Sequence, residues 1–380
     1  MQYVMDEFAH KHLTNALITC IVILLTEYVY ASLETMTDTA APTAARPLEP
    51  TPVRVAIVGA TGYAGQELVR VLARHPHALL TMATASQATS AARRLPGLAR
   101  IWEGEVVPLD AQAVIAHAEI VFLALPEAAS AEMGAMFLAA GRRVIDLSGA
   151  FRLRDDAARA KWYPATTTMP EGVVYGLTEF AGAEIPGARL VSCPGCYPTA
   201  SLLALQPLFA AGLLRPGADV IVDAKSGVSG AGKAPSDRTH FCENHGSVAA
   251  YGLFGHRHTA EMVQTLGGEV TFTPHLVPLD RGILSTIYAR LAPGVTAAQV
   301  DQTLRTAHAR SFFVRLTGEA LPEIKHVAYT NFCDIGWKVD EATGRIILVS
   351  VIDNLLKGAA GQAVQNFNLL IGVDERTGLL

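Results

Sequence analysis

Charged residues are scarce in this chain: Asp, Glu, Lys and Arg make up 17% of its 380 residues, whereas 50% are hydrophobic. The net charge is −5 and no segment forms a basic stripe, so we expect no nucleic-acid partner. The five cysteines are an odd number, and too few for the disulfide framework of a secreted protein of this size. These absences favour a globular cytoplasmic protein, long enough to require two domains.

The sequence also lacks a long apolar segment. Residues 13–26 are strongly apolar, but Glu27 interrupts the run, which is shorter than the ~20 residues that span a bilayer. A secretory signal peptide fits poorly, because Asp6 and Glu7 precede the run. We therefore expect no stable association with a membrane; a tethered form stays an alternative that fractionation would test.

The first 52 residues are expected to lie outside the folded part. Residues 37–52 are rich in Thr, Ala and Pro, a composition typical of disorder. We hypothesise that translation begins at Met36, which would leave residues 1–35 out of the expressed protein. The mass of the intact, natively expressed protein tests this, since a mass that includes residues 1–35 would contradict it.

A glycine turn follows the first predicted strand, residues 53–58. The turn reads Gly59-Ala-Thr-Gly-Tyr-Ala-Gly65, and an amphipathic helix follows it. Strand, turn and helix in this order are typical of a dinucleotide-binding fold, in which glycines let the backbone approach a pyrophosphate. The three glycines are spaced G-x-x-G-x-x-G rather than G-x-G-x-x-G, so the prediction depends on the position of the turn directly after a strand. We expect cofactor contacts from Gly59, Thr61, Gly62, Tyr63 and Gly65.

The loop after the second predicted strand, residues 78–84, carries no acidic residue. An enzyme that uses NAD usually has Asp or Glu there to bind the ribose hydroxyls. Hydroxyl side chains and arginines occupy this loop instead, and they suit a 2′-phosphate. We predict NADP(H) as cofactor, with Ser86 and Arg93 among its contacts; the alternative is that Arg93 and Arg94 are only solvated.

Two further predicted strands, residues 119–125 and 143–147, end in loops. Ligands bind at this edge of a doubly wound sheet. We therefore expect Ser148, which follows the second of these strands, to contact the cofactor.

Cys196 lies in Cys193-Pro-Gly-Cys-Tyr-Pro-Thr199, at the start of a predicted buried helix. Free N–H groups and the helix dipole favour a thiolate there, and a thiolate is the nucleophile of acyl transfer. The alternative is a buried structural cysteine. Cys193 and Cys196 form a C-x-x-C, but the sequence lacks the second pair of a zinc site and the pattern around a thioredoxin-like centre. We therefore expect neither a metal site nor disulfide exchange.

Polar residues concentrate in three further segments. Residues 223–233, after a predicted strand at 219–222, form a Gly-Ser loop with two lysines, and such loops can cradle phosphate. Residues 251–261 carry two histidines, an arginine and a glutamate at a helix start, a set suited to proton transfer. Residues 272–282 are strand-like and hold a histidine and an arginine.

Together these segments resemble the N-acetyl-γ-glutamyl-phosphate reductases of arginine biosynthesis, within the wider semialdehyde dehydrogenase group. The resemblance covers about residues 53–375. It is carried by the glycine turn, the Cys196 segment and residues 146–152, 226–232, 256–261 and 272–282. It implies an NADPH-dependent reduction of an acyl phosphate through a cysteine thioester, and a homodimer or homotetramer.

The resemblance implies a role for each matching residue. The nucleophile falls on Cys196 and the acid/base histidine on His256. Substrate binding falls on Arg152, Tyr251, His258 and Glu261, and contacts to nicotinamide and phosphate on Ser229, Gly230 and Asn354. The chain departs from the family pattern where it lacks an acid before Phe151, and at Cys193, where relatives often have Asn.

The fold class expected is α/β, with a Rossmann-type doubly wound parallel sheet domain and an α/β mixed-sheet domain for catalysis and dimerisation. We place the NADP-binding domain at 53–195 and the catalytic domain at 196–352, with a helix at 353–375 returning to the first. Residues 1–52 form the extension. Alternatives are a reductase of aspartyl or N-acetyl-aminoadipyl phosphate, and a non-catalytic NADP-binding redox sensor.

Overall fold

The computed structural model describes residues 51–85 and 91–380. Residues 52–380 form one compact unit. The hypotheses on residues 1–50 and the cofactor contact predicted for Ser86 lie outside the described residues. Within the described ranges, no helix is long and apolar enough to cross a membrane.

Seven strands form the first sheet, in the order β3-β2-β1-β4-β5-β7-β6, and every neighbouring pair is parallel. The predicted doubly wound sheet is therefore confirmed. β1 and β4 are buried almost throughout, as expected for parallel strands covered on both faces. The strands are β1 (Val53–Val58), β2 (Ala78–Thr84), β3 (Val106–Val107), β4 (Ile120–Leu123), β5 (Arg143–Asp146), β6 (Val173–Tyr175) and β7 (Leu190–Ser192).

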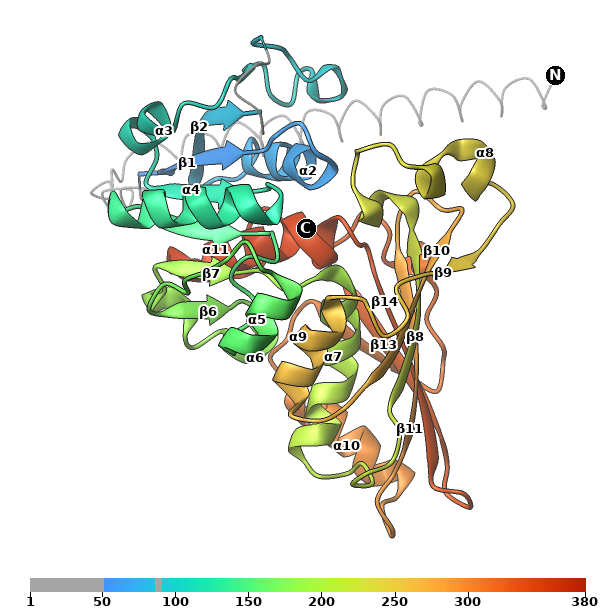
Figure 1. Ribbon diagram of the computed structural model, residues 1–380. Helices are drawn as coiled ribbons and strands as arrows, with labels where there is room; N and C mark the ends of the chain where they lie inside the picture. Colours follow the sequence, from blue (N-terminus) through green and yellow to red (C-terminus); the bar gives the residue numbers. More distant parts are fainter. Residues whose placement is uncertain (1–50, 86–90) are drawn as a thin grey trace, which may run out of the picture. The chain divides into compact units, whose positions relative to one another are not determined.

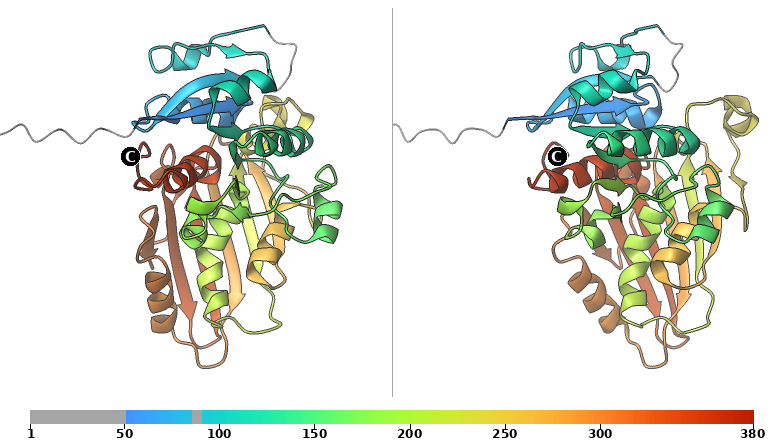
Figure 2. Two further views of the ribbon diagram at one scale, coloured as in Figure 1. Left: turned by 90° about the vertical axis from the view of Figure 1, so that its left-hand side faces the viewer. Right: turned by 60° about the vertical axis from the view of Figure 1, so that its left-hand side comes forward.

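Helices cover both faces of this sheet. Helices α3 (Ala111–His117) and α4 (Glu127–Ala139) pack on one face. On the other face α2 (Tyr63–Leu72) packs beside the C-terminal α11 (Gly361–Leu370), which Figure 2 shows in red next to the blue strands. The end of the chain thus completes the core that its first strand begins. Two short helices, α5 (Asp156–Trp162) and α6 (Thr178–Ala181), precede β7.

The second sheet is mixed, as predicted, with the order β12-β13-β14-β11-β8-β10-β9. Helices α7 (Cys196–Ala210), α9 (His258–Leu266) and α10 (Ala297–Ala307) lie on one face of it (Figure 1). The strands are β8 (Ile221–Gly227), β9 (Ala249–Ala250), β10 (Thr271–Val277), β11 (Ile283–Arg290), β12 (Val314–Gly318), β13 (Cys333–Asp340) and β14 (Arg345–Ile352).

The structure corrects two predicted elements. Only residues 272–277 of the strand-like segment 272–282 belong to a strand, β10, so Arg281 lies in the turn before β11 and not on the strand that holds His275. The strand expected at 219–222 begins two residues later and continues to Gly227 as β8, so Asp223 and Lys225 are strand residues rather than part of a phosphate loop. The reason is the pairing on both sides: β8 bonds to β10 and to β11 along this length. Its residues alternate between buried and half-exposed, a period of two that polar side chains do not prevent.

Candidate active site

Cys196 is the first residue of α7, with Gly195 as its N-cap residue. The predicted buried helix is confirmed, because most of α7 is inaccessible to solvent. Burial of the sulfur raises the pKa of Cys196 to about 11, although the Arg152 guanidinium and backbone N–H groups act in the opposite direction. Burial thus opposes the thiolate that the helix N-terminus favours, and the net shift of the pKa is toward the neutral thiol.

Cys196 lines two cavities. The first, of about 380 Å³, which we call the cofactor cavity, lies between the glycine turn and the loop after β8. The second, of about 660 Å³, which we call the substrate cavity, is bordered by the loop that precedes α9. His258 and Gly230 also line both. A ligand in either cavity can therefore reach the same sulfur.

The cofactor cavity gathers most of the residues predicted to bind the dinucleotide. Its lining includes the predicted residues Gly62, Tyr63, Gly65, Ser148, Ser229, Gly230 and Asn354. Gly59 and Thr61 belong to the same turn but do not line the cavity.

Close packing explains two glycines of the turn. Gly59 has a φ of +97°, and a Cβ there would lie 2.3 Å from the carbonyl oxygen of Ala124. A Cβ on Gly65 would lie 2.2 Å from the carbonyl oxygen of Gly59. Gly62 is the N-cap residue of α2, and no side chain caps this helix. The free N–H groups at its start are the donors that a pyrophosphate requires, so the turn fits a dinucleotide.

Asn354 fixes the opposite wall of the cofactor cavity. Its side chain is buried, accepts a hydrogen bond from the Gly282 N–H at 2.7 Å and donates to the Ser229 Oγ at 2.9 Å. A π-helix, Leu356–Ala360, follows it. A Cβ on Gly358 in this helix would lie 2.8 Å from the Cβ of Cys196, so the returning chain packs directly against the cysteine.

Lys233 joins the two sides of the cofactor cavity. It comes from the Gly-Ser loop, and its Nζ donates to the carbonyl oxygen of Thr61 in the glycine turn at 3.3 Å. The sequence indicated a lysine-bearing loop that cradles phosphate, but it contained no signal that this lysine reaches the turn. Tertiary structure brings the ammonium to the place where a pyrophosphate would lie.

Arg93 lies apart from this cavity. Its backbone pairs with Val106, and its exposed side chain has no hydrogen-bond or ion-pair partner within residues 51–85 and 91–380. Arg94 instead contacts the carboxylates of Glu103 and Glu105, at 3.6 and 3.8 Å. Of the two arginines, Arg93 is thus the one without a carboxylate partner among the described residues.

The substrate cavity brings together the predicted Tyr251, His256 and His258 with Cys196. It also contains Arg238, which the sequence analysis missed because it belongs to no recognisable motif. The Arg238 guanidinium lies 5.0 Å from the centre of the Tyr251 ring. Arg257 lines the cavity as well. Two guanidinium groups make this a cavity suited to an anionic ligand.

Both histidines are neutral at pH 7. Burial and then the charge of Arg257 lower the pKa of His256 to about 4, and burial, followed by the charge of His256, lowers the pKa of His258 well below its ordinary value. The Nδ1 of His256 accepts a hydrogen bond from the His258 N–H at 3.1 Å, so the neutral ring carries its proton on Nε2. The His258 ring packs onto Gly195, where a Cβ would lie 2.4 Å from the His258 Nε2.

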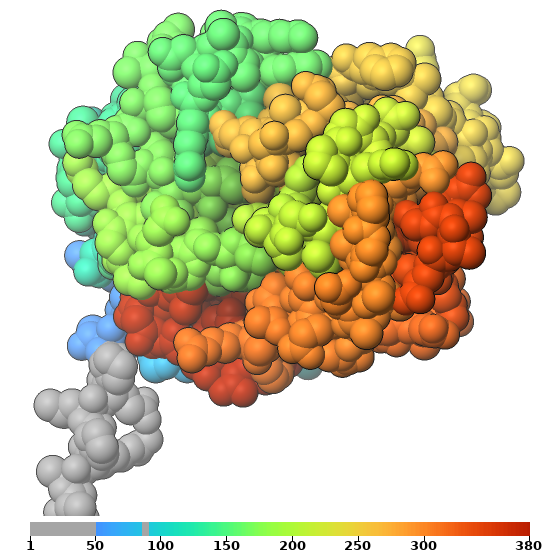
Figure 3. Space-filling model, turned by 90° about the horizontal axis from the view of Figure 1, so that it is seen from below, coloured from blue at the N-terminus to red at the C-terminus, as the bar shows by residue number. Residues whose placement is uncertain are grey.

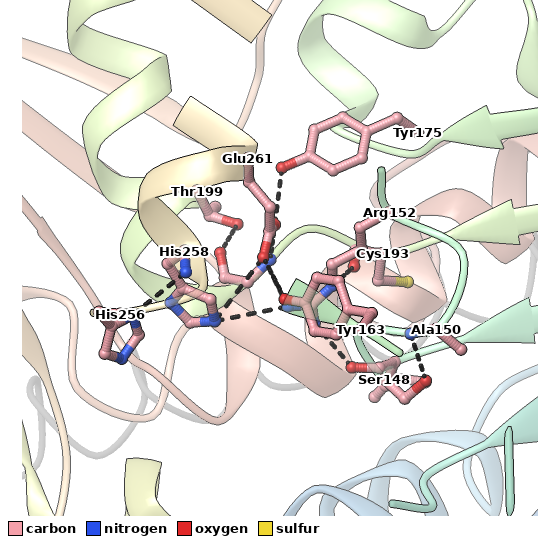
Figure 4. Close-up of polar contacts among 12 residues, drawn as sticks. Ser148, Ala150, Arg152, Tyr163, Tyr175, Cys193, Thr199, His256, His258 and Glu261 are labelled. Carbon is pink, nitrogen blue, oxygen red and sulfur yellow. Dashed lines mark hydrogen bonds and ion pairs between the residues drawn. The ribbon is translucent and has the colours of Figure 1, made fainter. Parts of the chain in front are cut away.

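Glu261 is fully buried and accepts four hydrogen bonds (Figure 4). Oε1 accepts from Arg152 Nη1 at 2.9 Å and from the Tyr163 hydroxyl at 3.1 Å. Oε2 accepts from the Tyr175 hydroxyl at 3.0 Å and from the Gly195 N–H at 2.9 Å. We call these five residues the Glu261 cluster. It holds the residue that precedes Cys196.

The structure places Glu261 outside both cavities, whereas Arg152 lines the cofactor cavity. Arg152 donates further bonds to the carbonyl oxygens of Cys193, at 2.9 Å, and Leu147, at 2.8 Å. The two residues predicted to contact substrate, Arg152 and Glu261, thus form an ion pair that bonds to the backbone of Cys193 and Gly195, just before Cys196. The sequence offered no signal for Tyr163 and Tyr175, since they lie far from the motifs in the chain.

Comparison with known proteins gives matches over both sheets. A family model described as "Semialdehyde dehydrogenase, NAD binding domain" matches residues 54–188, and "Semialdehyde dehydrogenase, dimerisation domain" matches residues 196–354. The N-acetyl-gamma-glutamyl-phosphate reductase of Brevibacillus brevis is 44% identical over 339 residues, covering 86% of this chain and 98% of the relative. That of Bacillus cereus is 41% identical over 339 residues, with the same coverage.

Solved structures show the same fold. Aspartate semialdehyde dehydrogenase II from Vibrio cholerae, complexed with ASA, matches with a TM-score of 0.64 and 21% identity, over 84% of this chain and 98% of that one. Aspartate semialdehyde dehydrogenase with NADP from Candida albicans matches with a TM-score of 0.64 and 15% identity, over 84% and 99% of the two chains.

Proposed function

Because this chain belongs to the N-acetyl-γ-glutamyl-phosphate reductase family of semialdehyde dehydrogenases, we propose that it reduces N-acetyl-L-glutamyl 5-phosphate to the 5-semialdehyde and phosphate in arginine biosynthesis. The observation that carries the proposal is the position of Cys196, whose side chain lines a dinucleotide-type cavity and an arginine-bearing cavity at once. The acyl phosphate would occupy the second of these.

Cys196 is the proposed nucleophile. Its sulfur forms a bond to the acyl carbon, the bond from that carbon to the phosphate oxygen breaks, and the phosphate dianion leaves as an acyl thioester forms. Since burial raises the pKa of the thiol, its proton has to leave as the bond forms, and the departing phosphate is a suitable acceptor. Arg257 and Arg238 supply positive charge in the cavity where negative charge moves onto the phosphate.

His256 acts on the oxygen of the reacting carbonyl in this proposal. Its Nε2 carries a proton and its Nδ1 is held by the backbone, so the ring is a hydrogen-bond donor of fixed orientation. A neutral imidazole can stabilise the oxyanion of a tetrahedral intermediate without being protonated in advance. An anionic substrate nearby would raise the pKa of His256, which would also allow proton transfer to that oxygen.

The nicotinamide cofactor, when bound, supplies the hydride that converts the thioester to the hemithioacetal, from which the aldehyde leaves as the thiol is restored. Gly62, Tyr63 and Gly65 would hold its pyrophosphate, with Lys233 above them. Ser148, Ser229, Gly230 and Asn354 would hold the nicotinamide end. Gly59 and Thr61 would shape the turn beneath.

We propose NADP(H) rather than NAD(H) as the cofactor. No carboxylate is present at the end of β2, and the Arg93 side chain is unpaired among the described residues. The test compares KM for NADPH and NADH in the native protein and in Arg93→Ala. We expect Arg93→Ala to raise KM for NADPH about tenfold and to leave KM for NADH unchanged, in line with the loss of a charged hydrogen bond.

We propose that Tyr251 and His258 contact the substrate from the walls of its cavity. Arg152 and Glu261 would act one step further away, as positioning residues that hold the cysteine loop through Gly195 and Cys193. The four cysteines of the described chain, Cys193, Cys196, Cys242 and Cys333, are free, which supports a cytoplasmic location.

The decisive experiment measures reduction of NADP by N-acetylglutamate semialdehyde with phosphate, in native protein and in Cys196→Ser. We expect the variant to lose turnover and to bind NADPH normally. Near-native turnover would remove Cys196 from its role. Equal activity with aspartate semialdehyde would contradict the proposed substrate, and would favour a reductase of a different acyl phosphate.

A homodimer or homotetramer is the proposed assembly. One face of the second sheet carries α7, α9 and α10, whereas the other presents partly exposed apolar side chains, among them Ile221, Tyr288 and Ile347 at 37%, 39% and 39% exposure. Contact with a second copy would bury them. We keep the domain boundaries at 195/196 and 352/353 as predictions, and residues 1–52 as an extension.

A further inference from the structure

A third cavity, of about 210 Å³, lies away from Cys196, and the proposed reaction does not use it. Four segments form it: the residue Arg154 before α5, the chain from β6 to just after α6, the C-terminal half of α7 and the end of α9. In Figure 3 the green surface of the β6–α6 segment meets the yellow-green end of α7 and the light-orange α9. Its lining consists of Arg154, Tyr175, Leu177, Phe180, Ala181, Glu184, Gln206, Gln264 and Thr265.

Two opposite charges border this cavity without pairing. The Arg154 guanidinium and the Glu184 carboxylate are exposed, and neither has an ion-pair or hydrogen-bond partner for its charged group among residues 51–85 and 91–380. They also do not contact each other. A ligand that carries a carboxylate and an ammonium would satisfy both.

A buried acceptor in the same cavity is also unsatisfied. The Gln206 Oε1 is inaccessible to solvent and has no donor within the described part of the chain. Leaving such an atom unpaired is unfavourable, and a donor that enters the cavity would remove the penalty. An ammonium has three N–H donors, enough for Glu184 and Gln206 together.

The size of the cavity limits the ligand. Cavities that hold drug-sized molecules start at about 300 Å³, so this one suits a smaller compound. Leu177 and Phe180 provide an apolar wall and Thr265 and Gln264 a polar one. From the two unpaired charges of opposite sign, the unsatisfied acceptor and the volume, we propose that the cavity binds a free α-amino acid as its zwitterion.

The cavity is connected to the Cys196 loop. Tyr175 lines it, and the Tyr175 hydroxyl donates to the Glu261 Oε2, which also accepts the Gly195 N–H. Gln264 bonds to the backbone of Arg152 and Arg154, at 3.0 and 2.6 Å. A ligand that moves Tyr175 or Gln264 therefore acts on the Glu261 cluster, and the proposal includes a change in turnover when the cavity is filled.

The test uses the full chain and each of the twenty common L-amino acids in turn, at millimolar concentration, in a thermal-shift assay followed by calorimetry. At least one is expected to raise Tm, and its N-acetyl derivative is not, because acetylation removes the ammonium. Arg154→Ala and Glu184→Ala should each raise its Kd tenfold or more. Arg310→Ala, at an exposed arginine elsewhere on the chain, is the matched control and should leave the Kd unchanged.

The initial rate of the reductase reaction is then measured with and without the amino acid that binds. A change in rate that disappears in Glu184→Ala supports the proposal. Binding without any change in rate would refute the connection through Tyr175. Failure of all twenty amino acids to bind, or binding that neither variant weakens, would overturn the site itself.

Discussion

Replacement of Glu261 by Gln removes one charge and almost no volume. All four groups around the carboxylate are donors: Arg152, Tyr163 and Tyr175 through their side chains and Gly195 through its N–H. The amide of Gln presents an NH₂ group in place of one oxygen, so two of the donors lose their acceptor. The Arg152 charge, 2.9 Å from Glu261 and 8% exposed, would remain buried without its partner.

Breaking a buried ion pair in this way costs about 3–5 kcal/mol. That is a large part of the ~5–15 kcal/mol by which native proteins are stable. We expect urea denaturation to show a loss of this size for Glu261→Gln, together with reduced turnover, because the Gly195 N–H is released next to Cys196. Tyr175→Phe removes one of the four donors to the carboxylate and leaves the ion pair with Arg152 intact, so it should cost less, about 1.5–3 kcal/mol.

The two variants together test whether the charge of Glu261 stabilises the fold. A loss below about 1 kcal/mol in Glu261→Gln would refute the argument, since it would mean that Arg152 finds water or another acceptor. A loss in Tyr175→Phe as large as that in Glu261→Gln would show that the hydroxyl, rather than the charge, carries the stability. Native turnover in Glu261→Gln would remove the carboxylate from positioning the loop.

Three further outcomes are expected. Gly195→Ala should fold, because its φ of −66° suits alanine, but should lose turnover as the new Cβ displaces His258; unchanged kcat would count against that contact. Lys233→Ala should raise the KM for NADPH about tenfold or more, because the loss of a charged hydrogen bond costs ~1.5–3 kcal/mol. The control variant Lys225→Ala should leave this KM unchanged. Alkylation of Cys196 by iodoacetamide should accelerate as the pH rises toward about 11, because the thiolate is the reacting form and burial raises the pKa of the thiol to about that value. The rate measured for Cys196→Ser is subtracted to remove the reaction of the other cysteines. A rate that no longer rises above pH 8 would contradict the raised pKa.

The sequence was sufficient to predict an element wherever the residues that form the element also determine its bounds. β1 and β2 have the predicted bounds, because short apolar runs flanked by turn residues leave little choice. The glycine turn could be predicted because close backbone contacts exclude a Cβ at Gly59 and Gly65. The end of β8 could not, because its length is set by hydrogen bonds to β10 and β11, which come later in the chain.

The sequence by itself determined the fold class, the cysteine at the start of one helix and the histidine pair at the start of another, because each of these signals depends on residues close together in the chain. Only the tertiary structure raised the pKa of Cys196, since burial outweighs the backbone N–H groups at the helix start. It also brought Lys233 to the glycine turn and Tyr163 and Tyr175 to Glu261. These contacts depend on how the sheets and helices pack, and no local pattern in the chain encodes that packing.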